Sequence, residues 1–318
     1  MKLRWQLMAA VLSSTAVVLA QTSSGIADRQ VFLFRALDSW SLDLSIATTM
    51  MQDPYPMVRA QAVNTMASNP EPARHLLLGN YLLDHDARVR EQVMLAAGRL
   101  GASGLGLATR GLNDPSPAVR QAAVWAASHA GKKAWPSLSK LATSEKNTAV
   151  LEMLLANLWR LEDVGWQSTA GRFAADANPY LRRAAAFSLS RNGDPSARRA
   201  QRLLAVDGEP VIRATALRGF ERGALDKTDL AVVVAALADS DWRVQAAAWR
   251  ALAAQEDAKA PATLGSAFAA AVSSSHPHLV AAALAAATTH ATVGTSKELL
   301  EVINGDDPWL AGEALVAL

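Results

Sequence analysis

Apolar and polar positions follow one another along this chain in a pattern that recurs about every 31 residues. Each copy has an acidic or small polar residue, most often a proline three places later, an aliphatic residue at the fifth place and a small apolar residue at the ninth. We count these places as offsets from the first residue of a copy. Self-similarity at a fixed period of this length predicts a repeat array. The copies begin at Asp53, Asp84, Asp114, Glu145, Asp176, Asp207, Asp239, Ser274 and Gly305.

The positions inside one copy predict a helix that begins at offset three. Proline is common there, and its fixed φ and missing N–H suit a first helical turn and prevent a preceding helix from continuing. The polar residue at offset zero can accept hydrogen bonds near the helix N-terminus, where the helix dipole also favours an anion. Offsets five and nine lie on one helical face, and offset thirteen continues it. We therefore expect these three offsets to form the core.

A second amphipathic stretch of about ten residues precedes each copy, for example over residues 75–83, 228–238 and 262–272. Each unit of the pattern is thus expected to be a helix, a turn and a second helix. One such hairpin cannot bury its apolar face alone, so stacked copies must share a continuous core. The sequence predicts an all-α fold, an α-solenoid (superhelix) of about nine helical-hairpin repeats of about 31 residues each.

Five copies combine an aspartate at offset zero with an aliphatic residue and an arginine at offsets five and six, as in Asp207 with Ile212 and Arg213. From about residue 40 to the C-terminus, the chain resembles HEAT repeats, specifically the short bacterial kind also found in phycobilin lyase-like proteins. The resemblance implies that aspartates and arginines of successive repeats form a ladder along the stack. Four copies depart from it, because other residues replace the arginine: Leu151, Gln245, Val280 and Ala311.

The residues at offset eleven point away from the predicted core and indicate a binding surface. In HEAT-like stacks the second helices line the concave face, so these residues are expected to form one row along it. The row is apolar in its middle and basic beyond, and aromatic residues and arginines most often anchor protein interfaces. With neighbours on the same helices, the predicted partner-binding residues are Leu95, Trp125, Trp159, Phe187, Arg191, Arg218, Arg222 and Arg250.

A structural interpretation of the same row stays open at this point. A shift of the helical phase by one position would make Trp125 or Phe187 a packing residue. The remaining tryptophans are interpreted as structural, because they stand near predicted helix starts or turns, where a ring can cover a helix end. They are Trp40, Trp135, Trp166, Trp242 and Trp309.

The N-terminus is typical of an export signal. Lys2 and Arg4 precede an uncharged stretch over residues 7–20, and small residues lead to a cleavage site before Gln21. An uncleaved anchor and a simple N-terminal helix are the alternatives. We predict a signal peptide over 1–20, an N-terminal capping segment over 21–39 and the repeat array over 40–318, its last repeat incomplete. The expected location is periplasmic or secreted, with no membrane contact beyond the signal.

The charge distribution changes once the signal is set aside. The signal carries two of the 31 basic residues and none of the 29 acidic ones, which leaves 29 of each and a net charge of zero. Neutrality and export both argue against nucleic-acid binding. Residues 171–225 hold ten arginines against five acids, and residues 226–318 hold five bases against eleven acids. This polarity reflects either solvated helix faces or a gradient that orients a partner.

Signatures of catalysis are sparse in this sequence. Without cysteine it has no thiol nucleophile, and it has no Gly-x-Ser-x-Gly elbow. The glycine-rich stretch from Gly101 to Gly106 lacks the lysine of a phosphate loop and is interpreted as a tight turn between repeats. The pair His276 and His278 is interpreted as incidental, and no His-Glu pair of the HEAT-like di-iron hydroxylases occurs. No catalytic residue, metal or cofactor is predicted.

Three classes of function follow from these observations. The first is an exported, non-catalytic scaffold or adaptor that binds a protein or peptide along the concave face. The second is the HEAT-repeat portion of an enzyme system, either peptidyl-prolyl isomerase-associated or phycobilin lyase-like. The third is nucleic-acid binding, as in the HEAT-like alkylpurine DNA glycosylases, which charge and export disfavour. The sequence ends at Leu318 inside a predicted helix, so we also expect contact through an uncapped C-terminal repeat or a truncated product.

Overall fold

A computed structural model of the chain describes residues 49–68, 78–162, 165–255, 264–290 and 293–318, together with Gly25, Arg29 and Val31. Every regular element in these residues is an α- or 3-10 helix, which confirms the predicted all-α solenoid. No helix among them has the length and apolar character needed to span a membrane. The predicted signal peptide, Trp40 and most of the predicted capping segment lie outside the described residues.

Contacts divide the chain into two compact units, residues 1–164 and 165–318, and we describe each by itself. We call the helices that begin at offset three B helices and those that precede them A helices. In the first unit the B helices are α4 (Pro56–Ala67), α6 (Ala87–Arg99), α8 (Pro117–His129) and α10 (Thr148–Asn157). Its A helices and 3-10 turns are η1 (Gly79–Leu83), η2 (Gly101–Gly104), α7 (Leu105–Gly111), η3 (Lys132–Ala134) and α9 (Trp135–Ser144), and η4 (Leu158–Leu161) extends α10.

The second unit repeats this arrangement. Its B helices are α12 (Pro179–Leu189), α14 (Pro210–Leu217) with its extension η6 (Arg218–Glu221), α16 (Trp242–Ala253), α18 (Pro277–Thr289) and α20 (Pro308–Ala317). Its A helices are α11 (Trp166–Arg172), η5 (Pro195–Ala197) with α13 (Arg198–Leu204), α15 (Lys227–Ala236), α17 (Gly265–Val272) and α19 (Ser296–Ile303).

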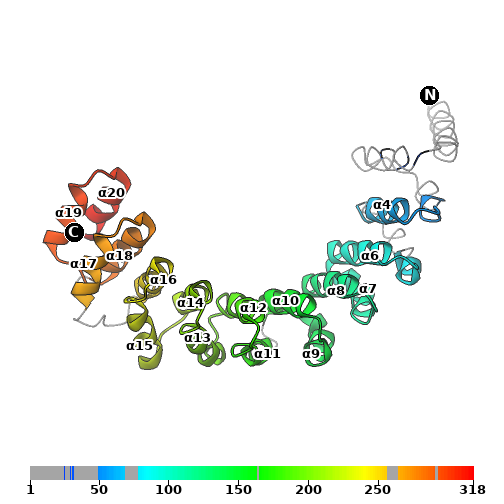
Figure 1. The fold of residues 1–318 in the computed structure, drawn as a ribbon, viewed down its shortest axis with the longest axis horizontal. Coiled ribbons are helices and arrows are strands. Elements are labelled where there is room, and N and C mark those ends of the chain that lie inside the picture. The colour runs from blue at the N-terminus through cyan, green and yellow to red at the C-terminus, as the bar shows by residue number, and fades with distance from the viewer. Residues whose placement is uncertain are drawn as a thin grey trace. The chain divides into compact units, whose positions relative to one another are not determined.

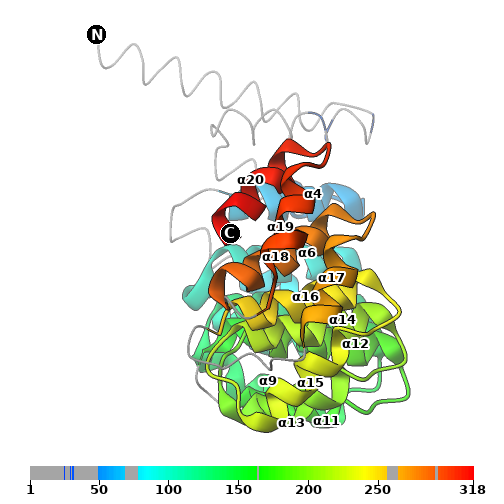
Figure 2. The same cartoon turned by 90° about the vertical axis from the view of Figure 1, so that its left-hand side faces the viewer.

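The helices of each unit form two layers. Each B helix packs against the next B helix of its unit, as α6 does with α8 and α16 with α18. In Figure 1, α12, α14, α16 and α18 lie on the inner side of the bend of the second unit, and α13, α15 and α17 lie on its outer side. In the turned view (Figure 2), α13 and α15 lie below α12, α14 and α16, while α17 overlaps the B helices. The B layer therefore forms the concave face within this unit.

The helix starts follow the pattern predicted from the sequence. All nine B helices of the described residues begin at offset three. The carboxylate at offset zero accepts the backbone N–H of offset two, for example Asp207 from Glu209 at 2.9 Å. In several repeats the residue at offset two then caps the helix, as Asn178 does by accepting the backbone N–H of Tyr180 at 2.9 Å. These two successive side-chain-to-backbone hydrogen bonds, at offsets zero and two, fix where each helix begins.

The core consists of the offsets that the periodicity assigned to it. Offsets five and nine are buried in all nine copies, as Ile212 and Ala216 show in one of them. Offset thirteen supplies larger buried groups such as Met66 and Phe220. The predicted core stripe is confirmed, and alanine at offset nine lets neighbouring B helices lie close together.

The ion-pair ladder that the resemblance implied is present in both units. In one rung the Arg182 guanidinium donates to both carboxylate oxygens of Asp207 at 2.6 and 3.0 Å, and to the backbone carbonyl of Asp176 at 2.9 Å. The arginine thus joins its own turn to the next repeat. Equivalent pairs are Arg29 with Asp53, Arg59 with Asp84, Arg90 with Asp114, Arg120 with Glu145, and Arg213 with Asp239.

Copies without the arginine lack this rung. Gln245 keeps only the contact within its own repeat, because its amide donates to the backbone carbonyl of Asp239 at 2.6 Å. Leu151 and Val280 are buried apolar residues. Where Val280 and Gly305 replace the two partners, a pocket of 290 Å³ lies between α18, α19 and α20. The buried core stripe therefore continues through these copies, although the ion-pair ladder does not.

Acidification is expected to destabilise both units, starting near the ordinary carboxylate pKa of 3.8. Burial by itself raises the pKa of Asp84 and Asp207, but hydrogen bonds from their arginines and from backbone N–H groups outweigh it and leave each pKa lowered. A lowered folded-state pKa contributes stability above the unfolded pKa, and this stability is lost as pH falls through the folded value. Urea unfolding followed by circular dichroism should therefore give a constant free energy at neutral pH and a falling one below about pH 4. An unchanged free energy down to pH 2 would contradict this linkage.

Candidate functional site

Two columns of surface side chains cross the B helices, at offsets eleven and fifteen. The two offsets are one helical turn apart, so they lie on one face, opposite the buried stripe. All residues of the described repeats at offset eleven are half-buried or exposed. We call this surface the B face of each unit. Its offset-fifteen column is mostly basic in the middle repeats, with Arg99, His129, Arg160, Arg191 and Arg222.

The B face of the first unit is built around Trp125. Its ring lies against Gly98 of the preceding repeat, where an added Cβ would overlap the indole. The imidazole of His129 lies 4.4 Å from the indole, centroid to centroid, and its Nδ1 is 2.8 Å from the Trp125 carbonyl oxygen. Trp125 remains half-buried. The ring is therefore held in place while part of it faces solvent.

The neighbours of Trp125 on this face are also held. Arg99 donates to the side-chain oxygen of Asn64 in the preceding repeat at 2.8 Å, and burial lowers the pKa of Arg99. At the other side the Arg160 guanidinium lies 4.5 Å above the Trp159 ring. Leu95, which stands between Asn64 and Trp125 in the offset-eleven column, is half-buried. The first unit thus presents apolar side chains at offset eleven with cations beside them.

The B face of the second unit starts with Phe187 and becomes strongly basic. Phe187 is 37% exposed, and the Arg191 guanidinium lies 4.5 Å above its ring. Two repeats further, the Arg250 guanidinium Nε lies 3.6 Å from a carboxylate oxygen of Glu221. Burial raises the pKa of Glu221, and the charges of Arg250, Arg218 and Arg222 oppose that shift. The charges of three guanidinium groups therefore act on one carboxylate, and Arg250 is paired with it.

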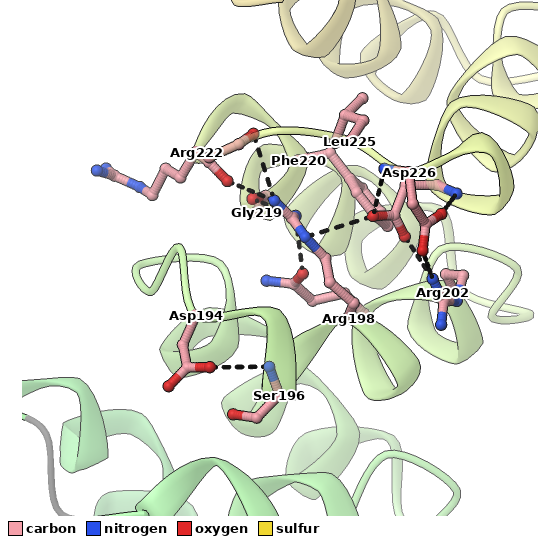
Figure 3. Close-up of polar contacts among 12 residues, drawn as sticks. Asp194, Ser196, Arg198, Arg202, Gly219, Phe220, Arg222, Leu225 and Asp226 are labelled. Carbon is pink, nitrogen blue, oxygen red and sulfur yellow. Dashed lines mark hydrogen bonds and ion pairs between the residues drawn. The ribbon is translucent and has the colours of Figure 1, made fainter.

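A buried arginine, Arg198, binds the backbone that carries the basic part of the B face. Arg198 is 6% exposed and donates to the backbone carbonyls of Gly219, at 2.9 Å, and of Arg222. Its Nε lies 3.5 Å from the buried Asp229, which also accepts from Arg202 at 2.6 Å. Figure 3 shows the Arg222 side chain extending away from this network while its carbonyl faces Arg198. The backbone that carries Arg218 and Arg222 is thus fixed.

The structure places seven of the eight sequence-predicted partner-binding residues on the B face, and the eighth, Trp159, lies in η4 at offset fourteen, beside Arg160 of the offset-fifteen column. Leu95, Trp125 and Trp159 lie in the first unit, and the other five lie in the second. Phe187 is exposed, whereas Trp125 is half-buried and its ring packs against Gly98, so Trp125 combines packing with partial exposure. Sequence reasoning missed Arg99, His129 and Arg160, although the same 31-residue period would have found them at offset fifteen. Glu221 was missed because it follows no periodic signal.

Other sequence predictions have simple structural outcomes. The first four residues of the glycine-rich stretch form the turn η2 between α6 and α7, as expected, and Gly101 has a positive φ of 55° there; the last two begin α7. His276 and His278 both stack on Trp242, with centroid distances of 4.8 and 6.4 Å. Trp166 is buried at the start of α11, whereas Trp309, near the start of α20, is 51% exposed. Among the described residues no cluster of three or more potential metal ligands occurs.

Comparisons with known proteins bear on the fold. No family model matches the chain, and no curated protein matches it. An engineered protein of known structure is similar over 97% of this chain and 94% of its own, with a TM-score of 0.56 and 17% identity. YibA of Escherichia coli is similar over 79% of this chain and 93% of its own, with a TM-score of 0.56 and 15% identity. A mutant of Kap121p is similar over 98% of this chain and 46% of its own, with a TM-score of 0.51 and 13% identity. At these identities the likeness shows the fold alone: the chain is a helical repeat protein.

Proposed function

We propose that this chain is an exported, non-catalytic scaffold that binds a protein or peptide along its B face. One observation carries the proposal. Successive repeats place large apolar, aromatic and arginine side chains at offsets eleven and fifteen, on a face of the B helices that the core does not use. Tryptophan and arginine are the residues most enriched among those that dominate binding energy at interfaces.

The way these side chains are held supports binding. Trp125 lies between Gly98 and His129, and the Phe187 ring lies under the Arg191 guanidinium. Side chains that are already ordered lose less conformational entropy when a partner binds. Aromatic rings and guanidinium groups are suited to contact and charge complementarity, which is why we propose binding without catalysis.

The proposed location rests on the sequence of residues 1–20. Its two cations, its uncharged stretch and its small residues before Gln21 form an export signal, so the scaffold would act in the periplasm or outside the cell. The proposed partner is accordingly an exported protein or peptide.

Removing two aromatic rings of the B face is expected to abolish partner capture. The double variant Trp125→Ala/Phe187→Ala removes one anchor from each unit, and an anchor of this kind contributes about 2 kcal/mol or more, which is roughly a thirtyfold change in affinity. The purified chain is immobilised and used to capture partners from an extract of exported proteins. Captured proteins are then compared between wild type and variant.

The matched control is Tyr180→Ala/Trp309→Ala. Both rings are more exposed than Phe187, at 57% and 51%, but they stand at offset four, away from the B face. The control should capture the same partners as wild type, and thermal unfolding of all three proteins should agree. Capture of the same partners by the Trp125→Ala/Phe187→Ala variant would refute the B face as the binding surface.

A further inference from the structure

The second unit contains a compact group of charges on its B face, which we call the arginine cluster: Arg218, Arg222, Arg250 and Glu221. Arg218 and Arg222 flank Glu221 in sequence, and Arg250 reaches it from α16. The three cations and one anion give the cluster a formal charge of +2. The exposed Phe187 of α12 and Arg191, just after this helix, belong to the preceding repeat, to which Arg222 is tied by donating to the Ser190 carbonyl at 3.3 Å.

The cluster is less neutralised than three other arginines of this unit, Arg182, Arg213 and Arg243. Arg182 and Arg213 each pair with an aspartate of the ladder, and Arg243 pairs with Asp241. In the arginine cluster three guanidinium groups share one carboxylate, and the Arg250–Glu221 distance of 3.6 Å is longer than a hydrogen bond. The excess positive charge is therefore available to an incoming anion.

The backbone that carries Arg218 and Arg222 is also fixed before any ligand arrives. Arg198 holds the carbonyls of Gly219 and Arg222, and the side chain of Gln255 accepts the backbone N–H of Leu225 at 3.2 Å and donates to the Phe220 carbonyl at 3.2 Å. These bonds tie the segment from η6 to α15 to both neighbouring repeats. Two guanidinium groups carried on a fixed backbone suit bidentate recognition of carboxylates.

We infer that the arginine cluster binds an acidic segment of the partner polypeptide, with an apolar side chain of that segment against Phe187. The inference rests on the proposed function and names the partner's chemistry at this part of the B face. Aspartate or glutamate carboxylates would pair with Arg218 and Arg222, which extend from the fixed η6 segment. Glu221 would oppose them and so limit the affinity.

A peptide fits this surface better than a nucleic acid does. A nucleic-acid strand carries one charge about every 3.4 Å and needs cations along its whole path. The offset-fifteen column of this unit has Ala254 and Thr289 after Arg222, and residues 226–318 hold eleven acids against five bases. The positive region is thus short, and it begins beside an exposed aromatic ring.

The test measures binding of three labelled probes to the full chain by fluorescence anisotropy. The first probe is a short peptide rich in aspartate and glutamate with one central leucine, the second is its asparagine and glutamine counterpart, and the third is an oligothymidylate of equal charge. We expect the acidic peptide alone to bind, and to bind more weakly as salt increases.

Substitutions at different residues of the arginine cluster should change the affinity for the acidic peptide in opposite directions. Arg218→Gln/Arg222→Gln should weaken acidic-peptide binding about tenfold or more, because charge-assisted hydrogen bonds are lost. Glu221→Gln should strengthen it severalfold, because a competing carboxylate is removed while the side-chain shape is kept. Arg199→Gln removes an exposed arginine from the A helix α13 and should leave the affinity unchanged.

Several results would overturn the inference. Equal binding of the neutral peptide would exclude recognition by charge, and tighter binding of the oligothymidylate would assign the cluster to nucleic acid. Weakening by Glu221→Gln would indicate a structural effect at the cluster. If the acidic peptide does not bind but capture of the partner protein still depends on Trp125, the inferred acidic segment is wrong and the proposed function stands. If capture of the partner protein does not depend on Trp125 either, the proposed function fails as well.

Discussion

Replacing Arg182 by alanine is expected to lower the free energy of unfolding of the second unit by about 3 kcal/mol. The substitution leaves Asp207 without its bidentate partner, and the Asp207 side chain is only 5% exposed. It also frees the Asp176 and Ala177 carbonyls, which the same guanidinium binds at 2.9 and 3.3 Å. A buried charge that loses its partner costs far more than an exposed one. Urea unfolding at neutral pH measures the loss.

The matched control is Arg243→Ala. Arg243 also pairs with an aspartate, but its side chain is 59% exposed, so its removal should cost less than about 1 kcal/mol. Equal losses for the two variants would show that the ladder contributes no more than a surface pair. The difference between the two losses of unfolding free energy measures what the ladder geometry contributes, because there one arginine joins two repeats.

Replacing Trp249 by alanine is expected to cost about 3–5 kcal/mol of unfolding free energy. The Trp249 side chain is fully buried in α16, and its ring meets the Phe268 ring of α17 edge to face, with centroids 6.1 Å apart. Alanine would leave a cavity between the A and B layers that the surrounding helices can only partly fill. Thermal or urea unfolding of the variant measures this cost.

Phenylalanine at position 249 is the companion variant. The indole Nε1 of Trp249 is buried and has no hydrogen-bond partner among the described residues. Trp249→Phe keeps an aromatic ring against Phe268 and removes this unsatisfied N–H, so it should cost clearly less than Trp249→Ala. If both variants lose the same stability, ring packing at this position does not hold the two layers together.

Periodicity in the sequence was sufficient to predict most of the fold. Because one helical hairpin is repeated, the same offset has the same environment in each copy, and nine copies average out local exceptions. This is why the helix starts, the buried offsets and the half-buried position of Trp125 outside the core stripe follow from the pattern. The ladder followed from the resemblance, and the structure shows it wherever the arginine is present.

Features that occur once could not be found in the same way. Arg198 and Asp229 are charged residues on A helices, which sequence patterns assign to the surface, yet they are 6% and 1% exposed. Their burial depends on carbonyls of Gly219 and Arg222 that become available only where α14 tightens into η6. The arginine cluster depends on this single arrangement, so its geometry required the structure.

Site-specific photocrosslinking tests the central claim most directly. A photoreactive phenylalanine analogue is placed at Leu95 or Phe187 on the B face, and at Lys140 or Arg199, which are exposed on the A helices α9 and α13. The account predicts crosslinks to the captured partner from the first pair of positions and none from the second. Crosslinks from the A-helix positions with none from the B face would contradict it.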